Sequence, residues 1–131
     1  MGSSKAGPKV LVVDDIRVIR ELLAKYLDRS GFATCVASDG QEALEVFQSE
    51  QPDLLISDVR MPHMNGYELT RQVREISNIP IVIMTAESDH LENDREAAID
   101  AGADAFYVKC DLAELLVEVK VLLARTEPGG E

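Results

Sequence analysis

The sequence predicts an α/β fold built on a parallel β-sheet with helices on both faces. Short apolar segments alternate five times with segments that have the period of amphipathic helices. Three of the apolar segments are continuous, which is typical of parallel strands covered on both sides. This alternation indicates a doubly wound sheet. The common order for five such strands is 2-1-3-4-5, with a switch point between strands 1 and 3.

The expected strands coincide with the apolar segments. We place them at Lys9–Asp14, Ala33–Ala37, Asp53–Ser57, Ile79–Thr85 and Ala105–Lys109. The first, third and fourth are the continuous apolar runs, so we expect helices to cover both of their faces.

Five helices are expected, one after each strand. Their ranges are 16–29, 39–49, 66–77, 89–101 and 111–125. The first stops before Gly31, and glycine commonly follows the end of a helix. The last opens with Asp111 and Glu114 at the spacing of a capping box, and Pro128 follows its end. These signals support five helices that alternate with the strands.

Length and composition limit the class of protein. The 131 residues suit one compact domain, which we place at 9–125 between a flexible leader (1–8) and a tail or cut linker (126–131). The net charge of −11 argues against a nucleic-acid surface, which needs clustered basic residues. Cys35 and Cys110 lack metal-site spacing, and no apolar stretch is long enough to span a membrane. We expect a cytoplasmic protein with reduced thiols.

Polar side chains stand at the ends of four expected strands. They are Asp14 and Asp15 after the first strand, Asp58 after the third, Thr85 at the end of the fourth and Lys109 at the end of the fifth. Ligands of doubly wound sheets bind beyond the carboxyl ends of the strands, so these residues should converge. Clustered carboxylates suit Mg²⁺, while a hydroxyl and an ammonium suit a tetrahedral anion. Together they supply the parts needed for phosphoryl transfer to an aspartate.

Four blocks of the sequence resemble the receiver domain of bacterial two-component response regulators. The blocks are VLVVDD, PDLLISDVRMPHMNGYEL, IPIVIMTA and AGADAFYVK. The resemblance extends from about Lys9 to Leu123 and includes the five polar residues at the strand ends. It implies the flavodoxin-like fold with strand order 2-1-3-4-5 and five helices.

The resemblance also implies a role for each acidic residue. Asp58 would be the phosphoacceptor, which receives a phosphoryl group from a histidine of a sensor kinase or phosphotransfer protein. The reaction would require Mg²⁺ or Mn²⁺. Asp15 would bind the metal directly and Asp14 through its water shell, while Asp58 and the backbone carbonyl of Arg60 would complete the protein ligands.

Further positions follow from the same resemblance. Thr85 would bond one phosphoryl oxygen through its hydroxyl, and Lys109 would pair with another. Phe106 occupies the aromatic switch position, whose rotamer follows the shift of Thr85. Cys110 departs from the family pattern, which usually has proline there, so we expect a trans Lys109–Cys110 bond. Such a domain dephosphorylates itself slowly but does not turn over an external substrate.

The expected partners are the kinase and an output domain or protein. In the family, the signal emerges on the face formed by the fourth helix, the fifth strand and the fifth helix. Val117 and Val121 lie there, either as a partner surface or as scattered exposed valines. Phosphorylation could also drive formation of a homodimer. No nucleic-acid or membrane contact is expected of this chain.

Two other classes of function compete with that of a phosphoacceptor. A haloacid-dehalogenase-like phosphatase would also use an aspartyl phosphate, but its DxDx(T/V) motif is missing after the first strand, where Asp14 and Asp15 precede Ile16 and Arg17. A degenerate receiver would act only as a docking module. The presence of all five polar residues argues against that interpretation.

Overall fold

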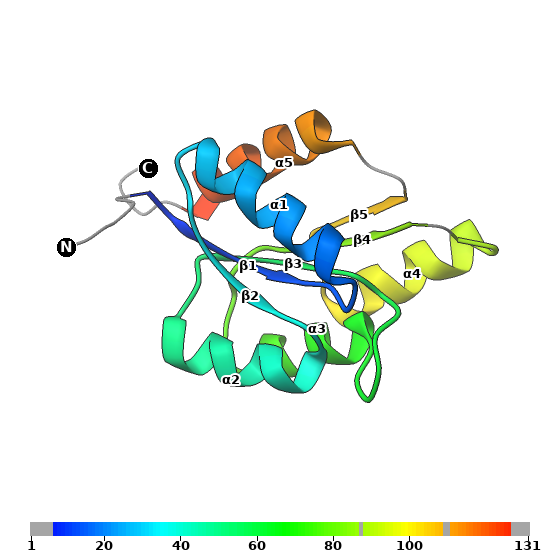
Figure 1. Cartoon of the computed structure of the whole chain (residues 1–131). Helices are drawn as coiled ribbons and strands as arrows, with labels where there is room; N and C mark the ends of the chain where they lie inside the picture. Colours follow the sequence, from blue (N-terminus) through cyan, green and yellow to red (C-terminus); the bar gives the residue numbers. More distant parts are fainter. Residues whose placement is uncertain (1–6, 87, 109–110, 127–131) are drawn as a thin grey trace.

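A five-stranded parallel sheet forms the centre of the molecule (Figure 1). The computed structural model describes residues 7–86, 88–108 and 111–126. The strands are β1 (Lys9–Val13), β2 (Ala33–Ala37), β3 (Leu54–Ser57), β4 (Ile81–Thr85) and β5 (Ala105–Val108). Their order is β2-β1-β3-β4-β5. The predicted fold class and strand order are therefore confirmed.

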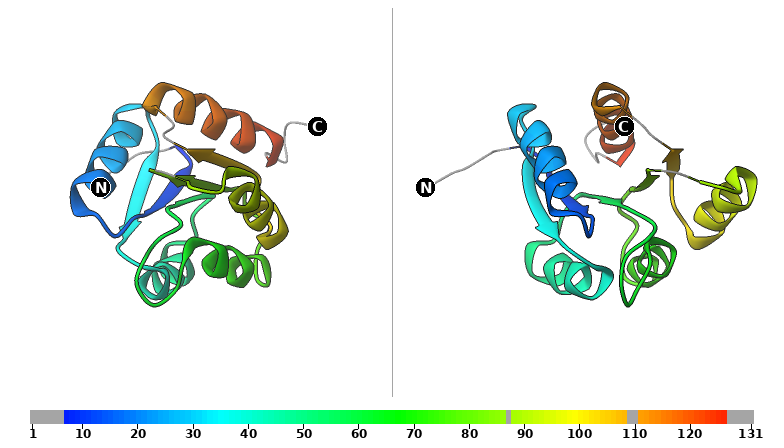
Figure 2. Two further views of the ribbon diagram at one scale, coloured as in Figure 1. Left: turned by 90° about the vertical axis from the view of Figure 1, so that its right-hand side faces the viewer. Right: turned by 45° about the vertical axis from the view of Figure 1, so that its right-hand side comes forward.

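Five helices cover the sheet in two layers. They are α1 (Arg17–Arg29), α2 (Gly40–Glu50), α3 (Gly66–Arg74), α4 (Leu91–Ala101) and α5 (Leu112–Thr126). Helices α1 and α5 lie on one face, and α2, α3 and α4 lie on the other (Figure 2). Within the described ranges, no helix combines the length and the apolar character needed to cross a membrane.

The two-residue repeat of β1 explains why its apolar run is continuous. Val10 and Val12 pack with Leu23 and Leu115 on the side of α1 and α5. Leu11 and Val13 point to the opposite side and join the core beneath the other three helices. Both faces of the strand are therefore buried, as the sequence pattern predicted.

Three element boundaries differ by two residues or more from those expected, and one of them is the start of α4, at Leu91 instead of residue 89. Helix α3 ends at Arg74 instead of residue 77, because the next backbone N–H groups, of Glu75 and Ile76, bond to carbonyls three residues back. Strand β4 begins at Ile81 instead of Ile79. The intervening Pro80 has no N–H to donate to a neighbouring strand. The predicted end of the fifth strand, Lys109, lies outside the described residues.

Arg74 joins three segments at the amino end of β4. Its guanidinium donates to the carbonyl oxygens of Gly102 (2.9 Å) and Ile79 (2.6 Å), and it forms an ion pair with Asp104 (2.7 Å). The same Asp104 carboxylate accepts the backbone N–H of Ile81 at 2.8 Å. This network fixes where β4 starts, and hence where its other end meets the pocket described below.

We expect Arg74→Lys to lower the free energy of unfolding by roughly 1–3 kcal/mol, measured by urea denaturation. A lysine ammonium cannot reproduce the planar fork that serves three acceptors, and the lost bonds involve a charged donor. Arg71→Lys, an exposed change on the same helix, is the control. Equal losses in the two variants would contradict a specific role for Arg74.

Candidate functional site

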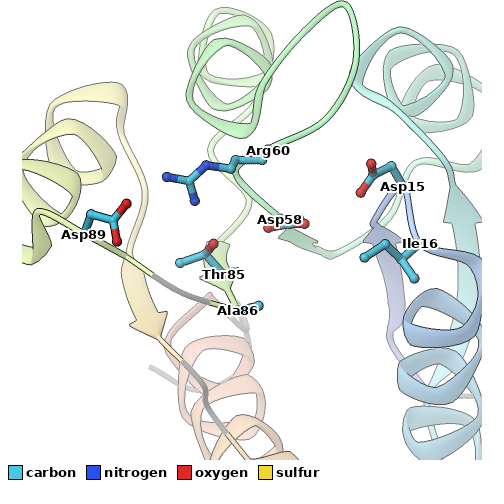
Figure 3. Close-up of a pocket in the computed structure, with 7 residues that line it drawn as sticks. All are labelled: Asp15, Ile16, Asp58, Arg60, Thr85, Ala86 and Asp89. Carbon is cyan, nitrogen blue, oxygen red and sulfur yellow. The ribbon is translucent and has the colours of Figure 1, made fainter.

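A pocket of about 450 Å³ opens at the carboxyl ends of the central strands (Figure 3). The residues that line it come from the end of β4 and from the loops after β1, β3 and β4. They are Asp15, Ile16, Asp58, Arg60, Thr85, Ala86 and Asp89. This is the switch point of the sheet, where the order of the strands reverses.

Three carboxylates meet at this edge of the sheet. Asp14, Asp15 and Asp58 each offer an oxygen atom, and these atoms all lie within 4.8 Å of one another. The register explains the meeting: Val13 of β1 is the partner of Ser57 in β3, so the residues that follow them are adjacent. The Asp58 N–H also donates to the Val13 carbonyl oxygen at 3.0 Å.

Asp14 is a buried member of this cluster, with 7% of its surface exposed. Burial raises the pKa of its carboxyl above the usual value, and the charge of Asp15 adds to that effect. The backbone N–H of Ile16 donates to Asp14 Oδ1 at 2.8 Å and works in the opposite direction. The carboxylate therefore has a fixed orientation beside the pocket.

Asp58 also has a raised pKa. Burial, followed by the charge of Asp14, raises its pKa to about 6, although the N–H of Val59 donates to Oδ1 at 2.7 Å. A cation among the three carboxylates would remove the repulsion between them. Three carboxylates with no histidine or cysteine among them form the oxygen-only donor set that a hard divalent ion such as Mg²⁺ prefers.

The loop after β3 holds Asp58 through close backbone contacts. A Cβ atom on Gly66 would lie 2.2 Å from the Asp58 carbonyl oxygen, so only glycine fits there. The Gly66 N–H donates to the Val59 carbonyl at 2.8 Å. Asn65 and Glu68 form a capping box at the start of α3. Glycine at position 66 therefore permits this close approach of two backbone segments.

The opposite wall of the pocket carries Thr85, Arg60 and Asp89. Thr85 ends β4 and is buried, with 7% of its surface exposed. The Arg60 guanidinium points toward the side of the pocket where Thr85 and Asp89 lie (Figure 3). Sequence reasoning missed Asp89, because a charged residue at the start of a helix is usually only solvated. Lys109 and Cys110, and with them the expected trans bond, lie outside the described residues.

Phe106 lies beneath this wall in β5. It pairs with Ile83 of β4, two residues before Thr85. The residue is 7% exposed, and the guanidinium carbon of Arg95 lies 5.6 Å from the centroid of its ring. Such a distance is within the range of a cation–π interaction. Arg95 lies on α4, so this contact, which the sequence did not indicate, joins the aromatic residue to that helix.

The architecture and the acidic cluster agree with comparisons to known proteins. The model of the response regulator receiver domain family matches residues 10–120. The chain belongs to this family. Response regulator MprA of Mycobacterium avium is 42% identical over 125 residues, which are 94% of this chain and 54% of that protein. The receiver domain thus spans about half the length of the curated relatives it matches.

Solved structures give the same result. The signal receiver domain of a signal transduction histidine kinase from Syntrophus aciditrophicus is 32% identical, covers 93% of this chain and 94% of its own, and has a TM-score of 0.84. The BeF3-activated N-terminal receiver domain of Klebsiella pneumoniae RstA is 28% identical, covers 88% and 97%, and has a TM-score of 0.82. Receiver domains are signalling domains, and the family binds Mg²⁺ at an acidic cluster like the one described above.

The raised pKa of Asp58 makes the stability of the metal-free receiver domain depend on pH. From the ordinary 3.8 the pKa rises to about 6, so the native state binds a proton that the unfolded chain has already lost. The domain therefore loses stability as the pH rises from about 4 to about 6. In the Asp58→Asn variant the side chain at this position cannot ionise, so this pH dependence should disappear. In EDTA above pH 6 the variant should be more stable than the wild type by on the order of 1–2 kcal/mol, with the gain vanishing near pH 4.

Denaturation curves at several pH values measure this difference. Asp89→Asn removes an exposed carboxylate from the same pocket and is the control. An equal gain in both variants would mean that net charge, and not the burial of Asp58, produces the effect.

Proposed function

We propose that this receiver domain accepts a phosphoryl group on Asp58 from a histidine of a sensor kinase or phosphotransfer protein. The observation that carries the proposal is the pocket at the switch point, in which Asp15, Asp58 and Thr85 share one cavity. Asp14, Asp15, Asp58 and the backbone carbonyl of Arg60 would hold Mg²⁺ or Mn²⁺. When bound, the ion neutralises charge on the transferred group and on the carboxylates.

The residues of the chain have distinct tasks in this reaction. An Asp58 carboxylate oxygen attacks phosphorus, a new O–P bond forms, and the N–P bond to the donor histidine breaks as the imidazole leaves. A pKa of about 6 keeps most of the Asp58 carboxyl ionised at neutral pH, as this attack requires. The Thr85 hydroxyl donates to one phosphoryl oxygen, and the Lys109 ammonium pairs with another. Water then hydrolyses the acyl phosphate slowly, without turnover of an external substrate.

Signal output is proposed to pass from Thr85 to Phe106 and the face formed by α4, β5 and α5. Several large apolar side chains are exposed on the two helices of this face: Leu91, Ile99, Val117 and Val121. An output domain, a protein partner or a second phosphorylated copy would bind there. The BeF3-activated form of the RstA receiver domain supports an activated state in the family. We place this step in the cytoplasm, as the resemblance to bacterial two-component regulators implies.

The proposed limits of the domain remain 9–125, with a leader at 1–8 and a tail or linker at 126–131. Strand β1 begins at Lys9, and α5 continues to Thr126, one residue beyond the proposed limit. The family match itself covers residues 10–120.

Incubation with acetyl phosphate and Mg²⁺ should add one phosphoryl group to the wild-type chain, detected by intact mass. Asp58→Asn should abolish the addition, because an amide cannot form the acyl phosphate. Asp89→Asn, which removes a carboxylate from the same pocket, should still be labelled. Undiminished labelling of Asp58→Asn would exclude it as the phosphoacceptor. Rapid release of phosphate with no adduct would favour a phosphatase, and no reaction would favour a docking module.

Mg²⁺ should also raise the thermal midpoint of the wild-type domain. A ligand that binds only the native state stabilises it by mass action, by about 2.7 kcal/mol at one hundred times Kd. Asp15→Ala should remove most of this rise because it deletes a direct ligand. Asp100→Ala, an exposed change on α4, should retain it. A thermal midpoint that does not respond to Mg²⁺ would contradict the metal site.

A further inference from the structure

We propose that Arg20 is a positioning residue that orients the Asp14–Asp15 pair for binding of the divalent ion. The inference rests on the proposed function, since it concerns the same metal site. Arg20 does not line the pocket and would not touch the ion. It would act through the backbone of the two acidic residues.

The contact that supports this role is made to the peptide unit between the two acids. Arg20 Nη1 donates to the Asp14 carbonyl oxygen at 2.7 Å. This carbonyl belongs to the peptide bond that joins Asp14 to Asp15. The planar peptide unit includes the Cα atoms of both Asp14 and Asp15. Its orientation therefore determines the positions from which the two side chains extend.

Arg20 can reach the peptide because the start of α1 holds it in place. The Arg20 N–H donates to the Ile16 carbonyl at 3.0 Å. The Ile16 N–H in turn donates to the Asp14 carboxylate at 2.8 Å. Asp14 is therefore held at its carboxylate by Ile16, at its carbonyl by Arg20 and at its N–H by the Ala37 carbonyl, 3.2 Å away. Three separate contacts fix one residue of the acidic cluster.

Such restraint matters because like charges within 4.8 Å drive one another apart. Asp15 is exposed, so it can swing toward solvent unless the backbone beneath it is held. If the carboxylates move apart in the absence of metal, the ion must bring them together again when it binds. The free energy that this costs weakens binding. A fixed Asp14–Asp15 peptide keeps the carboxylates close enough to share one ion.

The hydrogen bond of Arg20 should strengthen Mg²⁺ binding, whereas its positive charge should weaken it. Its attraction lowers the pKa of the Asp14 carboxyl, although burial has the larger, raising effect. In the metal-free protein the guanidinium thus stabilises the carboxylates. Toward an arriving cation, however, a nearby positive charge is repulsive. The hydrogen bond and the charge therefore predict changes of opposite sign when Arg20 is replaced, and a binding measurement can separate them.

Arg17 provides a matched control on the same helix. It carries the same charge one turn earlier, but its guanidinium pairs with Glu21 at 2.8 Å and both side chains are exposed. Arg17→Met and Arg20→Met each remove one positive charge near the start of α1. Only Arg20→Met also removes a hydrogen bond to the Asp14–Asp15 peptide.

The test is the Mg²⁺ dissociation constant, measured by isothermal titration calorimetry without any phosphodonor. Arg20→Met should bind Mg²⁺ about tenfold more weakly than the wild type, the lower end of the effect of outer-shell metal-site mutations. Arg20→Lys keeps the charge without the planar fork and should be weaker by at least about threefold. Arg17→Met should stay within about twofold. Raising the KCl concentration screens the charge effect, so the deficit of Arg20→Met should increase.

Equal or tighter Mg²⁺ binding by Arg20→Met at high KCl concentration, where the charge effect is screened, would overturn the proposal, because the hydrogen bond would then contribute nothing to Mg²⁺ affinity. Thermal melting in EDTA establishes that each variant is folded.

If Arg20→Met fails to fold, Arg20→Lys provides the test, and wild-type Mg²⁺ affinity in that variant would overturn the proposal. If the wild type itself binds no Mg²⁺, the proposed metal site and the role of Arg20 fail together. If the wild type binds Mg²⁺ and the Arg20 variants bind it with the same affinity, the metal site stands and the role of Arg20 fails.

Discussion

Electrostatic repulsion among Asp14, Asp15 and Asp58 is the constraint on which the rest of the site depends. Parallel pairing of β1 with β3 places these residues side by side. Both strands are almost fully buried, so the sheet cannot move apart to relieve the repulsion. Burial is the main cause of the raised pKa values of Asp14 and Asp58, and this repulsion adds to it. A site that destabilises its own carboxylates in this way is well suited to bind a cation.

The contacts that hold this cluster are made mainly by backbone groups. The N–H groups of Ile16 and Val59 donate to the Asp14 and Asp58 carboxylates, and Gly66 brings a second backbone segment against Asp58. Backbone donors move only with the loops that carry them, so they define positions more firmly than long side chains do. Arg20 adds a side-chain donor to this framework. The acidic residues therefore occupy a preorganised edge of the sheet, which reduces the cost of assembling the site when a ligand binds.

The sequence predicted the strands and the acidic cluster because both depend on local patterns. Continuous apolar runs identify buried strands, and the carboxyl ends of parallel strands lie at one edge, so Asp14, Asp15, Asp58 and Thr85 could be placed together. The start of β4 was misplaced because it depends on Arg74, which bonds to the carbonyl oxygens of Ile79 and Gly102. Arg20, Asp89 and Arg95 were missed for a related reason. Each looks like an ordinary helix or loop charge until tertiary contacts place it against a carbonyl, a pocket or a ring.

Helix α4 connects the pocket to the proposed output face, and its packing suits movement. Its buried residues are only two alanines, Ala98 and Ala101, whereas α1 buries two leucines. Polar contacts hold its first turn: Ser88 donates to the Asp94 carboxylate, and the Tyr67 hydroxyl donates to the Asp94 carbonyl. Burial of apolar area stabilises a helix in proportion to that area, so α4 is bound to the core more weakly than its neighbours. Weakly packed elements are the ones that shift at low cost in free energy. On the proposed function, a change at Thr85 would therefore move α4 before it disturbed the sheet.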